Sequence, residues 1–479
     1  MQSRRDQVQA HMFTMSRLSA AMLRSAPDHP DQPTGRSLRG ILGGLALAFI
    51  VAVLVTIVSV LFPPAREVNW RVNGAVVVDV SSGARYLYAD GVLHPVANLT
   101  SLRLILGGEP SVVTVERAAL VGTPRGAPVG VVGAPERLPD PGGLSRAPWL
   151  ACAAVAGRGA DAVPRFVLEV ATDRPVQPLG AEGTLVSAPD GSVHLLVGET
   201  RHLFDADGGA REALGYGTAP VRPVPAEFLR LLPAGPDLSP PEVSRRGDNG
   251  PILAGTATRL GQVFSGPGGA AYLLTGDGLV SITPTVLALL IGDPRTQDLA
   301  YGGATPQLVP IGARDVAEHR STRPPEIRVD ALPSVPPPLT DPAGDDLCAS
   351  VSADQDQPVL TLVTAAPVGA PLAGAPASGP TLAAGLVPGC GQVDQVVVAG
   401  DTGVLLRTTP TATWYLVADT GARYPLGEDG PAPELGYRGQ PAARLPEALV
   451  ELLPTGPVLD PEAYRPGGSG AAAPRPECD

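Results

Sequence analysis

One uncharged run near the amino terminus constrains this chain more than any other feature. Residues 41–62, ILGGLALAFIVAVLVTIVSVLF, contain no charged residue, no amide side chain and no proline, and they lie between Arg39 and Pro63. A helix rises about 1.5 Å per residue, so a helix over this run is roughly 33 Å long and can cross a hydrocarbon core of about 30 Å. The sequence therefore predicts one transmembrane helix, bounded by Ile41 and Phe62.

The run is better explained as a retained anchor than as a cleaved signal peptide or a buried core helix. A signal peptide has an apolar region of about 7 to 15 residues and a cleavage site of small residues, whereas two prolines follow Phe62. A core helix of this length normally carries a polar face. Arginine excess marks the cytoplasmic flank of a span, and arginine is concentrated before the run, at Arg4, Arg5, Arg17, Arg24, Arg36 and Arg39, with Arg66 and Arg71 close behind it. We expect a single-pass protein of the plasma (inner) membrane, with a cytoplasmic amino terminus and a periplasmic carboxy-terminal part.

All cysteines follow the anchor, at Cys152, Cys348, Cys390 and Cys478. An even number of cysteines in an exported region is typical of disulfides. Four cysteines allow three pairings, and their spacing alone does not choose between them.

An internal repeat organises the part beyond the anchor. Glycine and proline supply 57 and 55 of the 479 residues, a composition that approaches the range of unstructured chains. However, LGYGTAPVRPVPAEFLRLLPAGPDLSP (214–240) aligns without a gap with LGYRGQPAARLPEALVELLPTGPVLDP (435–461), and weaker copies begin at RYLYADGVLHPV (85–96) and AYLLTGDGLVSI (271–282). Each copy predicts a hairpin, a loop with an aromatic residue, and a short helix that begins at a proline and ends at LLPxGP.

Two stretches do not repeat, residues 148–172 and 345–365. Each holds one cysteine near the start of a strand-like run. We expect these stretches to be two halves of one central sheet, joined by Cys152 and Cys348. Closing so long a loop would constrain the unfolded chain by about 4 to 5 kcal/mol. The other two cysteines then form the second candidate pair.

The leader, residues 1–38, predicts an amphipathic helix that PDHPDQPTG (27–35) ends before the span. Its apolar face either lies on the inner membrane surface or docks on another protein, or the helix is a leader without a partner. The candidate partner-binding residues recur at helical spacing and are Val8, Met12, Met15, Leu18 and Met22.

The sequence predicts no catalytic, cofactor-binding or metal-binding residue. All 35 basic residues are arginine, so a phosphate-binding loop of the type GxxxxGK[ST] is absent. No HExxH or GxSxG motif occurs, and His194 and His202 fall at strand positions that favour a structural role. A net charge of −12 argues against a nucleic acid partner. One acidic group lacks the spacing of a calcium loop and predicts a solvated loop, namely Asp345, Asp346, Asp354 and Asp356.

The chain resembles the EccB family, the membrane-anchored core subunit of type VII (ESX) secretion systems of actinobacteria. The resemblance covers nearly the whole chain and rests on the leader DQVQAHMFTMSRLSAAMLR, the single anchor, PRGAPVGVVGAPERLP (124–139) and the paired LLPxGPxLxP segments. Its most distinctive piece is LHPVxNxxSxRLILG, carried here by Leu93, His94, Pro95, Val96, Asn98, Ser101, Arg103, Leu104, Ile105, Leu106 and Gly107.

The resemblance implies an α+β, β-rich fold. It places an amino-terminal amphipathic helix and one transmembrane helix before an elongated periplasmic domain, in which four repeats with a phage-lysin-like cell-wall-binding fold surround a disulfide-linked central domain. The expected domains are the leader 1–38, the transmembrane segment 39–64, the first repeat 65–142, the first half of the central domain 143–174, the second repeat 175–245, the third repeat 246–322, the second half of the central domain 323–372, the fourth repeat 373–461 and a disordered tail 462–479.

The resemblance also implies a function and partners. The expected function is a structural core subunit that anchors and bridges protomers on the periplasmic side during protein export, without a cofactor. The expected partners are an EccC-type motor ATPase, EccD, EccE and further copies of the chain, as a dimer or higher oligomer. Some family members carry an ATPase label, so the first alternative is a weak ATP hydrolase with ATP as its cofactor. The second alternative, a cell-wall-binding membrane module, rests on fold analogy.

Overall fold

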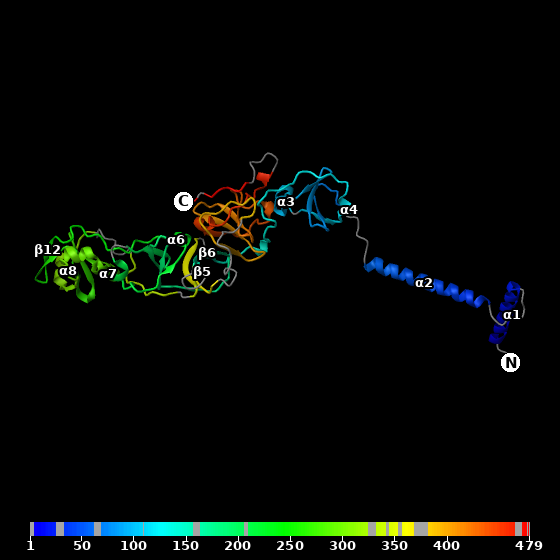
Figure 1. Ribbon diagram of the computed structural model, residues 1–479, viewed down its shortest axis with the longest axis horizontal. Coiled ribbons are helices and arrows are strands. Elements are labelled where there is room, and N and C mark those ends of the chain that lie inside the picture. The colour runs from blue at the N-terminus through cyan, green and yellow to red at the C-terminus, as the bar shows by residue number, and fades with distance from the viewer. Residues whose placement is uncertain are drawn as a thin grey trace. The chain divides into compact units, whose positions relative to one another are not determined.

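The chain forms two compact units, Met1–Val72 and Asn73–Asp479, in the computed structural model (Figure 1). The structure describes residues 4–24, 33–61, 69–108, 110–156, 163–205, 209–323, 332–341, 344–352, 357–367, 382–464, 472–476 and 478.

The first unit contains two helices, α1 (Arg4–Arg24) and α2 (Pro33–Leu61). The leader helix is therefore confirmed. Within α2, the stretch Leu38–Val58 is long and apolar enough to cross a membrane, and none of it is buried in the protein. The prediction that residues 27–35 break the chain before the span is wrong for its last residues, because α2 begins at Pro33. Proline suits the first turn of a helix, where its missing N–H would have no partner. Phe62 lies outside the described residues.

The second unit contains four sheets of four strands with one shared strand order. In each, three consecutive strands pair antiparallel, and the fourth strand lies parallel to the first, at the edge beyond it. The first sheet is β1 (Ala75–Asp79), β2 (Arg85–Ala89), β3 (Val92–Pro95) and β4 (Val112–Val115). The second is β8 (Gly183–Ser187), β9 (Val193–Val197), β10 (Thr200–Leu203) and β11 (Arg222–Pro223). The third is β14 (Val263–Ser265), β15 (Ala271–Thr275), β16 (Gly278–Ile282) and β17 (Val309–Pro310), and the fourth is β21 (Val404–Thr409), β22 (Trp414–Val417), β23 (Arg423–Pro425) and β24 (Ala443–Pro446).

Helices occur at the same two positions in the sequence of each four-stranded sheet. Between the third and fourth strands lie α3 (Leu99–Leu106), α5 (Ala210–Ala213), α7 (Pro284–Gly292) with η4 (Thr296–Ala300), and η6 (Pro433–Leu435). After the fourth strand lie α4 (Arg117–Leu120), α6 (Ala226–Leu231), α8 (Ala313–His319) and α9 (Glu447–Val450). The remaining short elements are η1 (Pro141–Gly143), η3 (Pro267–Gly269), η7 (Pro461–Tyr464) and the hairpin β12 (Asn249–Leu253) with β13 (Thr256–Arg259).

The distinctive LHPVxNxxSxRLILG stretch encodes both ends of α3. The side chain of Asn98 accepts a hydrogen bond from the backbone N–H of Ser101 and so caps the first turn. Gly107 ends the helix at φ 78°, in the left-handed region that glycine adopts without strain. The spacing of Asn98 and Gly107 therefore fixes the length of this helix.

A Pro-x-Gly segment covers the other edge of the first, second and fourth sheets. In the second sheet, the N–H of Arg201 donates to Pro233 O at 2.9 Å, and the N–H of Gly235 donates to Arg201 O at 2.8 Å. Leu93 bonds in the same way to Pro124 and Gly126, and Arg423 to Pro454 and Gly456. In the second and fourth sheets this segment is the LLPxGP sequence, which therefore adds an extended segment along the third strand as well as ending a helix.

A sheet of six strands takes its strands from two separate stretches of the sequence, one between the first and second small sheets and one between the third and fourth. Its order is β20-β6-β5-β18-β19-β7. Its strands are β5 (Trp149–Ala156), β6 (Val163–Val170), β7 (Val176–Pro178), β18 (Asp346–Ser352), β19 (Val359–Ala365) and β20 (Gln395–Val398). The two non-repeating stretches supply β5, β6, β18 and β19, and β5 pairs antiparallel with β18. Sequence reasoning assigned the segments of β7 and β20 to the second and fourth repeats instead.

The cores join each small sheet to a neighbour. One cluster joins Trp149 and Phe166 of the central sheet to Phe228 of α6 and Leu445 of β24. The first sheet's α3 contributes Leu104 to the core of the fourth sheet. Leu289 of α7 belongs to the core of the second sheet. A sheet of four short strands buries little apolar surface by itself, so these shared cores supply much of its burial.

Candidate functional site

The apolar face of α1 is the first candidate site, and it is uncovered within the first unit. All five predicted partner-binding side chains are exposed despite being apolar, from 56% for Met15 and Leu18 to 83% for Met22, with Val8 and Met12 between them. Apolar groups of this size are stabilised when they leave water, by about 25 cal/mol for each Å² that is buried. The face therefore has the chemistry of a surface that binds a partner helix or a membrane.

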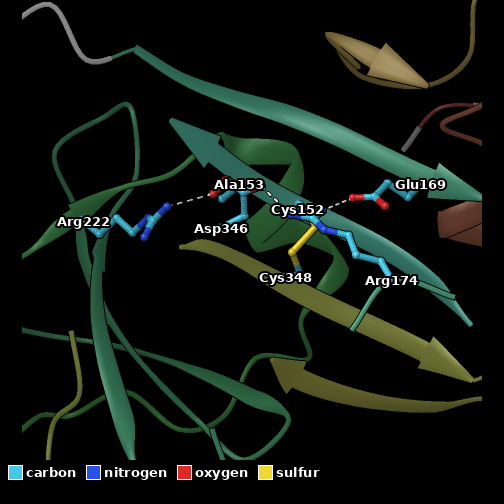
Figure 2. Close-up of a disulfide and its surroundings, with 7 residues drawn as sticks. All are labelled: Cys152, Ala153, Glu169, Arg174, Arg222, Asp346 and Cys348. Carbon is cyan, nitrogen blue, oxygen red and sulfur yellow. Dashed lines mark hydrogen bonds and ion pairs between the residues drawn. A yellow bond between two sulfur atoms is a disulfide. The ribbon is translucent and has the colours of Figure 1, made fainter. Parts of the chain in front are cut away.

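The Cys152–Cys348 disulfide lies at the centre of the six-stranded sheet (Figure 2). The two cysteines face each other directly in the β5–β18 pairing, their Cα atoms are 4.0 Å apart, and both side chains are fully buried. The bridge joins residues 196 positions apart in the sequence. It therefore ties together the two stretches that do not repeat.

A buried cluster of charged side chains accompanies this disulfide. Arg174 donates to Glu169 of β6, and its Nη2 lies 3.1 Å from Oδ2 of Asp346 in β18 (Figure 2). Glu169 is 5% exposed and Asp346 is 3% exposed. A buried carboxylate is tolerated only when it is paired. Arg174 thus connects β6 and β18, the two neighbours of β5, through one ion pair with each strand.

The prediction of a solvated acidic loop is wrong for Asp346. This residue begins β18 and is buried against Arg174, whereas the adjacent Asp345 is exposed. The sequence contains no signal for the pairing, because Arg174 is far from Asp346 along the chain. Asp354 and Asp356 lie outside the described residues.

Arg222 marks the contact between the second sheet and the central sheet. Its Nη2 donates to the carbonyl of Ala153 in β5 at 3.3 Å (Figure 2). Burial lowers the pKa of the Arg222 guanidinium, while the negative charge of Asp346 opposes that shift. Sequence reasoning also missed Arg222, because no local pattern sets apart one arginine that reaches another sheet.

The second disulfide, Cys390–Cys478, ties the carboxy-terminal tail to the loop after residue 382. The N–H of Cys390 donates to the carbonyl of Glu451, beside α9, at 2.7 Å. The tail that was predicted to be disordered, 462–479, lies largely outside the described residues, and Cys478 is one of its described positions.

The two buried histidines of the second sheet, His194 and His202, are hydrogen-bonded to segments next to their own strands. His202 contacts the carbonyl of Pro236 through Nδ1 at 2.8 Å, and His194 contacts Oγ of Ser192 through Nε2 at 3.1 Å. Burial also lowers the pKa of His194. Over the part of the chain that the structure describes, no group of three or more histidine, cysteine, aspartate or glutamate side chains is arranged to hold a metal ion.

One open cavity of about 660 Å³ lies beside the β15–β16 turn and the end of α8. Its lining includes Arg245, Arg320, Asp248 and Asp277. Because both signs of charge face this space, net charge does not select an anion or a cation there.

Residues 1–466 match the family described as type VII secretion system ESX-1, transport TM domain B. The relative named ESX-3 secretion system ATPase EccB3, from Mycolicibacterium smegmatis, is 28% identical over 490 aligned positions, which cover 95% of this chain and 89% of the relative.

Two solved structures share the fold. The EccB3 dimer from the ESX-3 core complex aligns with a TM-score of 0.58 and 25% identity, over 81% of this chain and 98% of that chain. A chain of the intact ESX-5 inner membrane complex aligns with a TM-score of 0.59 and 22% identity, over 96% of this chain and 94% of that chain. The similarity therefore includes both the helical leader and the β-rich unit.

Proposed function

Because this chain belongs to the EccB family of type VII secretion, with residues 1–466 matching the family, we propose that it is a structural core subunit of an ESX inner-membrane complex, in which it anchors and bridges protomers on the periplasmic side. The observation that supports this proposal most strongly is the extent of the family match. The matched residues include the leader helix α1, the candidate membrane span in α2 and all four small sheets.

The architecture supports a scaffold. The four small sheets have the same strand order and the same two helix positions, so we propose that they are copies of one duplicated unit. Repeated units of this kind together present a large surface, which suits the bridging of neighbouring subunits. A phage-lysin-like cell-wall-binding character of this unit stays a prediction.

The leader supplies the cytoplasmic contacts in this proposal. The exposed side chains of Val8, Met12, Met15, Leu18 and Met22 would bind an EccC-type motor ATPase, EccD or EccE on the cytoplasmic side. Arginine is frequent before the apolar run of α2 and scarce directly after it, and this asymmetry supports a cytoplasmic amino terminus.

The test is a gentle detergent extraction of the tagged full-length protein, followed by mass spectrometry of all proteins that co-purify. We expect a motor ATPase and a multi-spanning membrane subunit. Replacing Met12 and Met15 together by aspartate is expected to remove those partners and leave the second unit folded. Replacing Arg4 and Arg5 together by glutamine is the matched control, because it also changes two side chains of α1 but leaves the five apolar residues in place. We expect this variant to keep the partners. Recovery of the protein alone from native membranes would contradict the proposal.

ATP hydrolysis is the second candidate, because the relative from M. smegmatis is named an ATPase. The chain has no lysine, so a phosphate loop that depends on lysine is not available to it. The deciding measurement is ATP turnover by the purified protein after a wash that removes any motor ATPase. Turnover that copurifies with this chain at constant specific activity would favour the enzyme over the scaffold.

A further inference from the structure

The third small sheet differs from the other three at one corner. In every sheet one residue of a covering segment bridges to the third strand, and in chain order these residues are Arg125, Ala234, Arg320 and Thr455. Proline and glycine flank this residue in three sheets, whereas the third sheet has His319 and Ser321 there. The hairpin β12–β13 also precedes this sheet, and the cavity of about 660 Å³ lies beside both features. The cavity is therefore built partly from residues that the other three sheets lack.

Two arginines of the cavity lining have no partner. The side chains of Arg245 and Arg320 are exposed and make no hydrogen bond or ion pair within the described part of the chain. In the first sheet, by contrast, the corresponding Arg125 stacks over the ring of Tyr86, 4.9 Å from its centre. An unpaired guanidinium group offers a planar fork of N–H donors that fits a carboxylate or a phosphate. Two such forks border this one cavity.

Two of the three carboxylates in the described lining are already paired with arginines outside it. Oδ1 of Asp277 lies 3.1 Å from Nη1 of Arg323, and Oε1 of Glu318 lies 2.8 Å from Nε of Arg314. Asp248 is the third carboxylate and has no such partner among the described residues. The unpaired charges of the lining are thus two guanidinium groups and one carboxylate. They favour an anion, although the lining as a whole carries both signs.

The β15–β16 turn places backbone donors next to Arg245. Thr275 and Gly278 close the turn, and over the described residues no hydrogen bond uses the N–H groups of Gly276 and Asp277 between them. A Cβ atom at Gly276 would lie only 2.9 Å from Nη2 of Arg245, so the glycine allows the guanidinium group to approach the turn. Arg245 has φ 56°, in the left-handed region that costs a non-glycine residue free energy. The surrounding fold therefore holds this arginine beside the turn.

We propose that this cavity binds a small oxyanion, a carboxylate or a phosphate, between the guanidinium groups of Arg245 and Arg320. Charge-assisted hydrogen bonds from the two arginines hold the oxyanion, and the N–H groups of Gly276 and Asp277 supply further donors. Asp248 repels a second negative charge and accepts a hydrogen bond from a hydroxyl or amino group of the same ligand. The site is independent of the proposed scaffold role.

The lining also limits the kind of anion. Its described residues include no tryptophan, tyrosine or phenylalanine, so they offer no ring on which a nucleotide base stacks. The net charge of −12 repels polyanions such as nucleic acids and anionic membrane surfaces. A volume of about 660 Å³ is in the range of small-molecule sites. The occupant is therefore a small molecule with one anionic group.

Chemical modification of arginine tests this site on the purified full-length protein. Phenylglyoxal reacts with accessible guanidinium groups, and mass spectrometry reports the extent of reaction at each arginine. Inorganic phosphate or acetate, at about ten times its dissociation constant, is expected to slow the modification of Arg245 and Arg320 about tenfold. Sodium chloride at the same ionic strength should not slow it. Arg438 is the internal control, because it is exposed and lies outside the cavity.

Three variants sharpen this test. Arg320→Gln is expected to abolish the protection of Arg245, whereas Arg438→Gln, the matched control, is expected to retain it. Asp248→Asn removes the opposing carboxylate, so phosphate should give half-protection at a severalfold lower concentration. Unfolding does not raise the affinity of a site, so Asp248→Asn decides the matter even where Arg320→Gln is unstable.

Protection by phosphate alone would assign a phosphate ligand, and protection by acetate alone a carboxylate ligand; either result supports the site. Equal slowing at Arg438, or equal slowing by sodium chloride, would reveal a general salt effect and overturn it. Unchanged modification of Arg245 and Arg320 with both probes would also overturn it, and so would unchanged affinity in Asp248→Asn. The measurement uses the purified chain and does not depend on which proteins co-purify with it.

Discussion

At the scale of single residues, the glycine of the Pro-x-Gly segments has a specific steric role. Gly126 packs against the ring of His94, Gly235 against the ring of His202, and a Cβ atom at either position would overlap that ring. In the fourth sheet Gly456 lies in the same way against Tyr424. The repeated glycine is therefore required because a ring from the third strand occupies the space of its missing side chain.

The first prediction follows from this contact. Gly235→Ala is expected to lower the free energy of unfolding by about 1 to 3 kcal/mol, because the methyl group forces His202 out of its place. Thermal melting of the full-length protein, followed by its β-sheet circular dichroism, is the measurement. Gly108→Ala is the control, since a Cβ there meets no atom within 4 Å. Equal melting of the two variants would contradict the steric argument.

The second residue-scale prediction concerns Asp293, which is 1% exposed. Burial opposes its ionisation, but hydrogen bonds from Arg246 and from the backbone N–H of Arg295 outweigh burial and hold the pKa of Asp293 below its ordinary value. A carboxylate with a lowered pKa in the folded state stabilises the fold above its unfolded pKa of about 4, and this stabilisation is lost as the pH falls further.

Asp293→Asn is therefore expected to melt below the wild type at pH 7, with a difference that narrows as the pH falls below about 4. Melting temperatures measured between pH 7 and pH 3 check this. Asp277→Asn is the control, because Asp277 forms an exposed ion pair with Arg323. This variant should lower the free energy of unfolding by no more than about 1 kcal/mol. A difference that stays constant with pH would show that Asp293 does not act through its charge.

At the scale of elements, a disulfide and an ion-pair cluster reinforce the backbone hydrogen bonds of the central sheet. The disulfide joins β5 to β18, and Arg174 joins β6 to β18. Both connect segments that are far apart in the sequence. The sheet therefore depends on long-range contacts that neither half can form alone.

Arg174→Met is expected to destabilise the second unit by about 3 to 5 kcal/mol, because Glu169 and Asp346 would stay buried without a counter-charge. Urea unfolding monitored by tryptophan fluorescence is suitable, since Trp149 lies in the neighbouring strand β5. Arg314→Met is the control, because it removes only the exposed ion pair with Glu318. It should lower the free energy of unfolding by at most about 1 kcal/mol. Similar costs for the two variants would mean that the buried cluster contributes little.

Replacing Cys152 and Cys348 together by alanine tests the bridge. The chain-entropy model assigns about 5 kcal/mol to a loop of this length, so the urea midpoint should fall by a corresponding amount. The β5–β18 ladder and Arg174 remain, so we expect the variant to keep its native circular dichroism. Loss of all β structure before urea is added would show that the sheet requires the bridge in order to form.

At the scale of the whole molecule, the orientation of the chain in the membrane can be tested. Ser19→Cys in α1 and Val121→Cys in the second unit would each add a single free thiol, because the native cysteines are paired. A membrane-impermeant maleimide applied to intact cells should label Val121→Cys and not Ser19→Cys, while both should be labelled after lysis. Labelling of Ser19→Cys in intact cells would reverse the proposed topology.

The sequence by itself determined the features that depend on neighbouring residues. The uncharged run 41–62 predicted a helix that is long and apolar enough to cross a membrane, because that property needs only length and apolarity in one segment. Turn residues between short apolar runs predicted hairpins at the places of β2–β3 and β15–β16, because a tight turn sets the pairing of adjacent strands.

Only the tertiary structure decided which distant segments meet. It added β7 and β20 to the central sheet, and it buried Asp346 against Arg174 where the sequence suggested a solvated loop. Pairing across long sequence distances depends on how the packed cores place each strand in space, and no local pattern of residues records that placement.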